Sequence, residues 1–222
     1  MRNYISILQN CPLFSGIAED DIEKLCKCLG AHERAIDKDA FVFRAGDDIR
    51  SIYVILSGSM HIIDEDFWGN RSIIEKMGEQ TLFGEAYTLA STDKYLVSVI
   101  AAESSVILEI DPGRLFETCT NACTCHEVLI RNIATILSEK IVRITEKIGH
   151  IAQRTMREKI LSYLSKCARQ AGSSVFEIPY SRQQLADYLC VDRSALSHEL
   201  SRLQKTGMIS YRKNRFELPD WE

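Results

Sequence analysis

Short runs of alternating apolar and polar residues, separated by Gly and Asp, follow one helical segment at Ala18–Leu29 in the first half of the chain. Alternation with a period of two is typical of half-buried strands. The pattern predicts strands at Ala40–Arg44, Ser51–Leu56, Ser59–Ile63, Arg71–Lys76, Leu96–Ala101 and Ser105–Ile110. Many short strands at this spacing indicate a sandwich or jelly roll.

From His126 to Ile151 the apolar period becomes helical, with no Pro in the segment and no Gly before Gly149. The apolar positions alternate in steps of four and three, as in a heptad seam. They are Ile130, Ala134, Leu137, Ile141, Ile144, Ile148 and Ile151. A narrow stripe rich in Ile favours a two-stranded coiled coil and hence a parallel homodimer. The alternative is a helix that packs only on its own domain.

The last third of the chain predicts a helix at Thr155–Gln170, a short strand at Val175–Pro179 and then a pair of short helices. Ser181 and Gln184 form a capping box at the start of the first short helix. Asp192 is a suitable N-cap for the second, whose Leu196, Leu200 and Leu203 form one apolar stripe. Two short amphipathic helices joined by about three residues indicate a helix-turn-helix.

The polar side of the second short helix carries donors suited to base edges and phosphates. After it, Met208–Tyr211 and Phe216–Leu218 predict a hairpin, or wing, around the basic turn Arg212–Arg215. The alternatives are a helix pair that only packs and a charged turn that is merely solvated. The candidate DNA-binding residues are Ser181, Arg182, Arg193, Ser194, Ser197, His198, Arg202, Arg212, Lys213 and Arg215.

The chain has 222 residues and a formal net charge of −4, which taken alone argues against a nucleic-acid partner. The charge is unevenly distributed, because residues 1–151 carry −8 and residues 152–222 carry +4. The C-terminal third is therefore a basic module on an acidic body, an asymmetry that suggests a nucleic-acid partner. No apolar run is long enough to span a bilayer, and no signal peptide is recognisable, so we expect a cytoplasmic protein without membrane contact.

In this order and spacing, these segments resemble the CRP/FNR family of bacterial transcription regulators. The resemblance rests on Pro12-Leu13-Phe14, Ala45-Gly46-Asp47, Tyr53-Val54-Ile55, Ser57-Gly58-Ser59, Phe83-Gly84-Glu85, Glu146-Lys147-Ile148-Gly149 and Arg182–Leu203. It implies a sequence-specific, homodimeric DNA-binding regulator and not an enzyme. It further implies a palindromic double-stranded DNA operator, contact with RNA polymerase, and a response to a small molecule or a redox signal.

The expected fold class is α+β: an N-terminal double-stranded β-helix, of the jelly-roll or β-roll type, as the sensor domain, a long dimerisation helix, and a C-terminal winged helix-turn-helix. The expected limits are 1–125 for the cyclic-nucleotide-binding-like β-roll, 126–151 for the dimerisation helix and 152–222 for the DNA-binding domain.

The chain departs from the cyclic-nucleotide-binding members of the family in its candidate effector pocket. Where those members place an Arg followed by Ser or Thr after the Gly-Glu pair, this chain has Tyr95-Leu96, and Ile144-Thr145 replaces a Thr-Ser pair. Without the fork of an arginine the cyclic phosphate would lack a matched partner, so we do not expect cyclic AMP to be the ligand. The candidate pocket residues are Gly84, Glu85, Tyr87, Tyr95, Leu96, Ile144 and Thr145.

The second short helix also differs from that of well-studied members. Ser194 stands where many have a Glu and His198 where Arg is usual, whereas Arg193 keeps the position of a guanine-reading arginine. We therefore expect a different target sequence, with Arg193 making a bidentate contact to guanine. Cys190 takes the turn position usually held by Gly.

Eight cysteines are too few for a disulfide scaffold in a chain of this length. Three of them cluster with a histidine at Cys119, Cys123, Cys125 and His126. This cluster suits zinc or an iron–sulfur centre, a thiol switch at a helix N-terminus, or cysteines used as small buried apolar residues. No cofactor is firmly predicted. A metal-dependent β-roll enzyme is the other function class, and the lack of a His-x-His pair argues against it.

Overall fold

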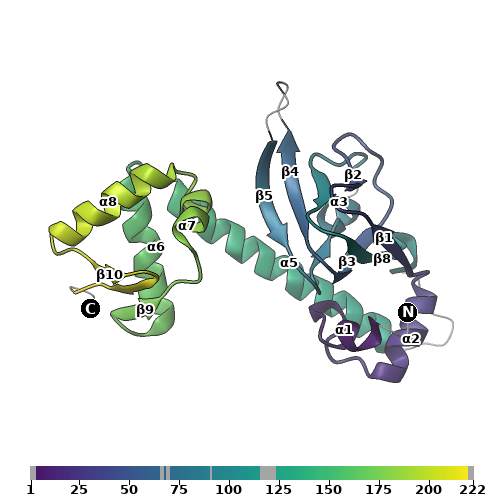
Figure 1. Cartoon of the computed structure of the whole chain (residues 1–222). Helices are drawn as coiled ribbons and strands as arrows, with labels where there is room; N and C mark the ends of the chain where they lie inside the picture. Colours follow the sequence, from purple (N-terminus) through teal and green to yellow (C-terminus); the bar gives the residue numbers. More distant parts are fainter. Residues whose placement is uncertain (1–3, 66–67, 69–70, 91, 116–123, 220–222) are drawn as a thin grey trace. The chain divides into compact units, whose positions relative to one another are not determined.

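The computed structural model describes all residues except 1–3, 66–67, 69–70, 91, 116–123 and 220–222. The chain forms two compact units, Met1–Ser138 and Glu139–Glu222, so the boundary lies inside the long helix α5 (Thr124–Ile151; Figure 1). The expected domain limits at 125/126 and 151/152 stay predictions. Among the described residues, no helix is both long and apolar enough to cross a membrane.

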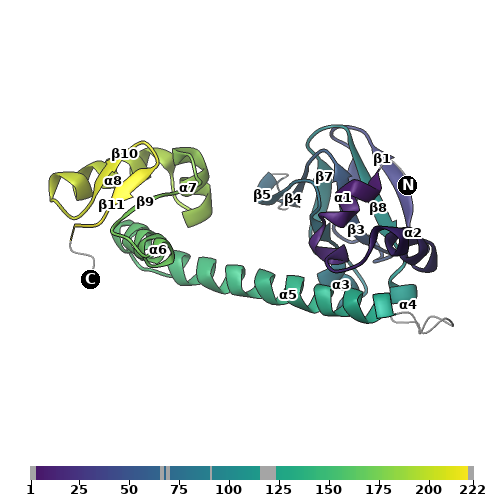
Figure 2. The same cartoon turned by 90° about the horizontal axis from the view of Figure 1, so that it is seen from below.

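The first unit contains two four-stranded antiparallel sheets, in the orders β1-β8-β3-β6 and β2-β7-β4-β5 (Figure 2). The expected α+β class, with a β-rich N-terminal domain, a long helix and a helix-turn-helix domain, is confirmed. The strands are β1 (His32–Ile36), β2 (Phe41–Phe43), β3 (Ile52–Ser57), β4 (Met60–Glu65), β5 (Arg71–Met77), β6 (Leu82–Phe83), β7 (Ser98–Ala101) and β8 (Ser105–Ile110).

All six predicted strands are present, and β1 and β6 are additional. The sequence of β1 is His-Glu-Arg-Ala-Ile, and only Ile36 is buried, because β1 lies at the edge of its sheet. Such an edge strand lacks the alternating pattern on which the prediction depended. Strand β6 has only two residues and pairs with Tyr53 and Val54 of β3, which is too short for periodicity to reveal.

One face of the β1-β8-β3-β6 sheet packs on helices, and the other faces the second sheet. The first face carries Val54, Leu108 and Ile110 against the N-terminal helices and the start of α5. Asn132 of α5 donates hydrogen bonds to the carbonyls of Leu13 and Ser15, at 2.9 and 2.8 Å. The helices of this unit are α1 (Ile5–Gln9), η2 (Pro12–Phe14), α2 (Glu19–Cys28), α3 (Glu85–Leu89) and α4 (Pro112–Leu115).

The long helix α5 extends the predicted His126–Ile151 segment by two residues at its start. Leu129 and Ile133 are buried in the core of the first unit. Beyond them the apolar stripe is open: Ile141, Ile144 and Ile148 are 63%, 58% and 53% exposed. The heptad seam therefore presents apolar side chains that the chain's own described residues leave uncovered.

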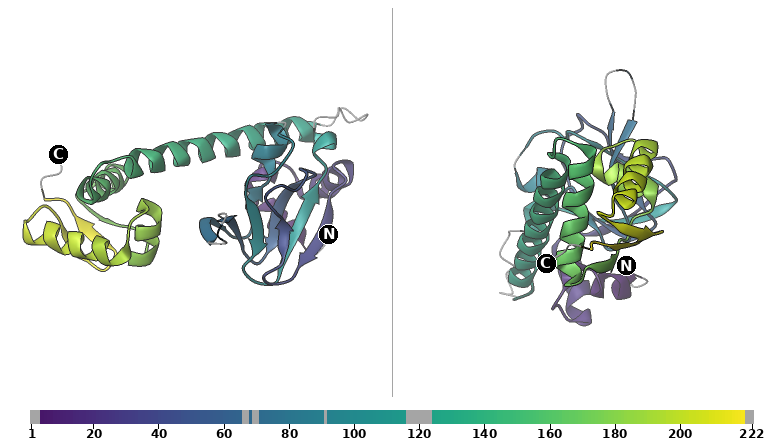
Figure 3. Two further views of the ribbon diagram at one scale, coloured as in Figure 1. Left: turned by 90° about the horizontal axis from the view of Figure 1, so that it is seen from above. Right: turned by 90° about the vertical axis from the view of Figure 1, so that its left-hand side faces the viewer.

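The second unit is a small winged helix domain (Figure 3). Its three-stranded sheet has the order β10-β11-β9, so β9 pairs with the wing strand β11. A core of fifteen buried residues, including Leu196, Leu200 and Leu203, joins the helices to this sheet. The elements are α6 (Met156–Ala171), β9 (Val175–Glu177), α7 (Arg182–Leu189), α8 (Arg193–Lys205), β10 (Ser210–Arg212) and β11 (Arg215–Glu217).

Candidate nucleic-acid interface and effector region

Helices α7 and α8 form the predicted helix-turn-helix, and side-chain caps define where each begins. The Ser181 hydroxyl accepts from the Gln184 amide at 3.3 Å, and the Gln184 side chain accepts from the Ser181 amide at 2.8 Å. Asp192 accepts from the amides of Ser194 and Ala195 at 2.8 and 3.0 Å. Both predicted caps are confirmed, and they leave Cys190-Val191-Asp192 as the turn.

Cys190 occupies the tightest point of this turn. Its φ of +53° lies in the left-handed region that favours glycine. The amide of the next residue, Val191, donates to the Ala186 carbonyl at 3.0 Å and so closes the end of α7. The side chain of Cys190 is exposed, so the strain of this conformation comes from its own backbone.

The outer side of α8 presents polar side chains above the buried leucines. Arg193, Ser194, His198 and Arg202 are exposed, and Ser197 is half-buried. Two hydroxyls are held by the helix itself: Ser194 donates to Asp192 at 2.6 Å, and Ser197 donates to the Arg193 carbonyl at 2.9 Å. Both hydroxyl oxygens can still accept a hydrogen bond. This face therefore offers two cations, an imidazole and two hydroxyls along one side of a helix.

Strands β10 and β11 form a hairpin with a basic tip. Arg212 pairs with Arg215, so Lys213 and Asn214 make a two-residue loop. The side chains of Arg212, Lys213 and Arg215 are exposed. The predicted wing is thus present, with its strands at Ser210–Arg212 and Arg215–Glu217 instead of Met208–Tyr211 and Phe216–Leu218.

Arg182 differs from the other candidate DNA contacts. Its guanidinium donates to the Lys213 carbonyl at 2.7 Å and lies over the rings of Tyr211 and Phe216. Burial lowers the pKa of this guanidinium. Arg182 therefore packs against the wing hairpin. The remaining cations of the candidate interface are exposed.

The Gly84-Glu85 pair opens α3 inside the first unit. Gly84 has a φ of +81°, and a Cβ at this position would lie 3.0 Å from the Tyr53 ring. Left-handed backbone and close packing both require glycine here. Glu85 is buried and Tyr87 is half-buried. Ile144 and Thr145, which the sequence assigns to the same pocket, are exposed residues of the second unit.

Tyr95 stands where the resemblance implies an arginine in cyclic-nucleotide-binding members of the family. Its buried ring stacks on Phe43 with a centroid separation of 3.7 Å, and its hydroxyl donates to the Ser51 carbonyl at 3.3 Å. The neighbouring Leu96 is instead 72% exposed. Of these two predicted pocket residues, Tyr95 is buried in the hydrophobic core with Phe43, and Leu96 faces solvent.

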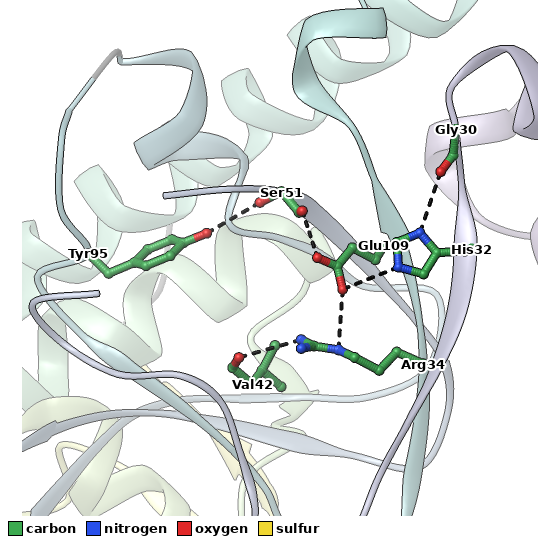
Figure 4. A network of polar contacts seen from close by, with 7 residues as sticks. All are labelled: Gly30, His32, Arg34, Val42, Ser51, Tyr95 and Glu109. Carbon is green, nitrogen blue, oxygen red and sulfur yellow. Dashed lines mark hydrogen bonds and ion pairs between the residues drawn. The ribbon is translucent and has the colours of Figure 1, made fainter. Parts of the chain in front are cut away.

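A polar network that the sequence pattern does not indicate lies next to Tyr95 (Figure 4). The Glu109 carboxylate accepts from the Ser51 hydroxyl at 2.7 Å and lies 3.2 Å from Nε of Arg34 and 3.8 Å from Nε2 of His32. Arg34 also donates to the Val42 carbonyl at 3.4 Å. The available signal was Glu109 itself, an acidic residue between the apolar Leu108 and Ile110 of β8.

The described cysteines divide into buried and accessible groups. Burial raises the pKa of Cys11 to about 11 and that of Cys26 to about 12, so both thiols stay protonated at neutral pH and suit the role of small apolar residues. Cys119 and Cys123 lie outside the described residues, whereas Cys125 and the buried His126 lie in the first turn of α5. Among the residues that are described, no three His, Cys, Asp or Glu side chains gather as a metal site.

Two family models match the chain. Residues 33–121 match the cyclic nucleotide-binding domain, and residues 158–222 match the Crp-like helix-turn-helix domain. One match lies in each unit; the first includes strands β2 to β8 and all of β1 but His32, and the second includes α7, α8 and the wing.

Named proteins of similar sequence are bacterial regulators. The regulatory protein HlyX of Actinobacillus pleuropneumoniae is 24% identical over 92% of this chain and 84% of its own length. The transcriptional activator protein anr of Pseudomonas aeruginosa is 25% identical over 80% of this chain and 72% of its own. The solved structure of the c-di-GMP-responsive global regulator CLP of Xanthomonas campestris shares the fold, with a TM-score of 0.60, 22% identity, and coverage of 90% of this chain and 99% of that one.

Proposed function

Because the chain belongs to the CRP/FNR family of transcription regulators, which are not enzymes, we propose that it acts as a homodimer that reads a palindromic operator and responds to a small molecule. The observation that carries the proposal is the exposed polar face of α8, with Arg193 and His198, beside the basic wing tip. A helix of this kind enters the major groove, while cations near it meet phosphates.

Within this proposal, Arg193 and Lys213 have different roles. Arg193 is the first residue of α8, and the N-terminal part of a recognition helix reaches base edges. Its planar fork matches the O6 and N7 atoms of guanine. Lys213 lies at the tip of the wing, where a flexible ammonium fits a phosphate. Arg193 supplies sequence preference, and Lys213 supplies affinity for DNA of any sequence.

The homodimer is supported by the uncovered stripe on α5. Ile141, Ile144 and Ile148 are more than half exposed, and burying the rest of each side chain would stabilise the protein by about half of the 1.5–3 kcal/mol that full burial contributes. A second α5 with the same heptad pattern covers this stripe in a parallel coiled coil. Two-fold symmetry then places two α8 helices in successive major grooves, about 34 Å apart.

The signal is assigned to a small molecule other than cyclic AMP. The match of residues 33–121 to the cyclic nucleotide-binding domain supports a ligand-binding role for the first unit. Tyr95 supplies an aromatic ring and a neutral hydroxyl where an anionic phosphate would require a cation. The raised pKa values of Cys11 and Cys26 argue against these two thiols as the sensor.

We place the action of the protein in the cytoplasm, where DNA and RNA polymerase are its further partners.

Selection of DNA from a random pool by the full-length protein, followed by footprinting, tests the proposal. We expect enrichment of a palindrome with half-sites separated by about one helical turn, and protection of both halves. Recovery of asymmetric or unrelated sequences would overturn the homodimeric, sequence-specific part of the proposal.

A further inference from the structure

The backbone of the wing accepts hydrogen bonds from α7, from α8 and from Ile178, the residue after β9. The Lys213 carbonyl accepts from Arg182 of α7 at 2.7 Å, and the Asn214 carbonyl accepts from the Ile178 amide at 2.9 Å. The Tyr211 carbonyl accepts from the side chain of Gln204, on α8, at 3.4 Å. The carbonyls of the hairpin therefore face the rest of the second unit, and its basic side chains are exposed to solvent.

Arg182 makes more contacts with the wing than a single hydrogen bond. Its guanidinium carbon lies 4.8 Å from the centre of the Tyr211 ring and 5.1 Å from that of Phe216, within the range of cation–π attraction. Nη2 bonds to the wing, and Nη1 is buried with no hydrogen-bond partner among the described residues. Because Arg182 is the first residue of α7, its charge also opposes the helix dipole. Its position therefore serves the wing and not the helix.

The residue that Arg182 holds is itself in an unfavourable conformation. Lys213 has a φ of +55°, a backbone region in which a non-glycine residue costs free energy. A hydrogen bond to the carbonyl of this same residue favours the observed turn over the extended alternatives. Without it, the turn would be released, and the side chains of Arg212, Lys213 and Arg215 would lose their common orientation.

We propose that Arg182 is a positioning residue that sets the wing against α8, and that it acts on DNA through the wing instead of through a phosphate contact of its own. The inference rests on the proposed DNA-binding function, and it reassigns one of the residues that the sequence placed in the interface. It is specific to an arginine, because only the planar guanidinium can stack on two rings and donate a directed bond at the same time.

A double-mutant cycle separates the two roles. The full-length protein is titrated against a fluorescent duplex of random sequence, with Arg182→Gln introduced both alone and in a protein whose wing is neutralised by Arg212→Gln, Lys213→Gln and Arg215→Gln. We expect Arg182→Gln alone to reduce the salt slope by more than the ~0.9 that one phosphate contact contributes. In the neutralised protein it should have no further effect. Equal losses of affinity in both proteins, with a slope change of about 0.9, would overturn the proposal.

Arg193→Gln is the matched control, because it removes an exposed arginine of the same domain that does not touch the wing. Whatever its effect on the random duplex, that effect should be the same with and without the wing charges. Arg182→Lys adds a second distinction. It keeps the charge but loses the fork, so we expect it to resemble Arg182→Gln, whereas a phosphate contact would be largely retained.

Hydrogen exchange of the wing tests the inference without DNA. Amides of residues 208–218 should exchange faster in Arg182→Gln than in Lys213→Gln, while those of α6 stay protected in both. Unchanged wing protection in Arg182→Gln would refute the positioning role. Failure of the proposed function is a separate outcome, because it would appear as absence of DNA binding by the unmodified protein.

Discussion

Nδ1 of His150 lies 2.8 Å from the hydroxyl oxygen of Ser162, which links the end of α5 to α6. The His150 ring is buried, with its edge toward Tyr163 at 5.8 Å, and its Nε2 has no hydrogen-bond partner among the described residues. Burial lowers the pKa of His150, and Lys166 lowers it further. The remaining nearby groups are Arg169, which also lowers the pKa, Glu146, which raises it, and the Tyr188 ring.

This burial predicts that the second unit loses stability in mild acid. The folded-state pKa of His150 lies below its ordinary value of 6.5, so the unfolded chain binds a proton first as the pH falls below about 6.5. The loss is at most about 1.4 kcal/mol per pH unit and ends once the folded state is also protonated. Urea unfolding between pH 5 and 8, read by pulse-labelled hydrogen exchange of α6 at one common pH, measures it.

The variant His150→Asn keeps an amide near Ser162 but cannot titrate, so its unfolding free energy should depend less on pH over this window. His32→Asn is the control, because His32 is an exposed residue of the first unit. A His150→Asn profile parallel to that of the unmodified protein would show that His150 does not cause the acid sensitivity.

Replacing Arg193 with Ala should reduce affinity for the selected operator by about 1–3 kcal/mol and relax the preference at one base pair in each half-site. The reason is the loss of a bidentate contact to a base edge. Competition binding against operators with single substitutions measures the effect. An equal loss on operator and random DNA would contradict the assigned role of Arg193.

Replacing Lys213 with Gln should instead weaken binding to all sequences alike. The side chain is exposed at the wing tip, where we propose that it meets a phosphate, and one lost phosphate contact lowers the salt slope by about 0.9. Titrations of operator and random duplexes over a range of salt concentrations give this slope. A change in base preference with an unchanged slope would assign Lys213 to direct readout.

Replacing Ile141 with Asp should convert a dimer into a species of 25.2 kDa. The side chain lies on the heptad seam and is 63% exposed in the single chain, so a charge there would be buried without a partner on association. Val142→Asp is the matched control, since Val142 is 56% exposed but lies beside the seam. Sedimentation at micromolar concentration gives the mass of both variants. A dimeric Ile141→Asp protein would show that the dimer does not form through this seam.

Calorimetry with cyclic AMP at millimolar concentration should detect no binding. The Tyr95 ring is packed on Phe43 at 3.7 Å, and the phosphate would enter without an arginine to neutralise it. A micromolar affinity would show that another cation takes this role and would overturn the interpretation of Tyr95.

Several elements could be predicted because their signals are local. The caps at Ser181 and Asp192 act over two or three residues, and the structure contains both. The stripe of Leu196, Leu200 and Leu203 follows from helical geometry alone, and all three are buried. Periodicity likewise located six of the eight strands that the described part of the first unit contains.

Other features depend on contacts between distant parts of the chain. Glu109 and Arg34 are paired because β8 and β1 are neighbours in one sheet, and β1 itself has no recognisable period. Arg182 was assigned to DNA from its place in the motif, yet it packs on Tyr211 and Phe216, about thirty residues away. Neither spacing nor composition indicates such partners.

The sequence by itself therefore determined the class of the protein, its helix-turn-helix, the basic charge of its DNA-binding end and the apolar seam of α5, because these depend on residues close together in the chain. Only the tertiary structure decided which cations are exposed and which are held inside, where Tyr95 lies, and that His150 is buried. The exposure and pKa of a side chain are set by neighbours that folding brings together, and these neighbours are not adjacent in sequence.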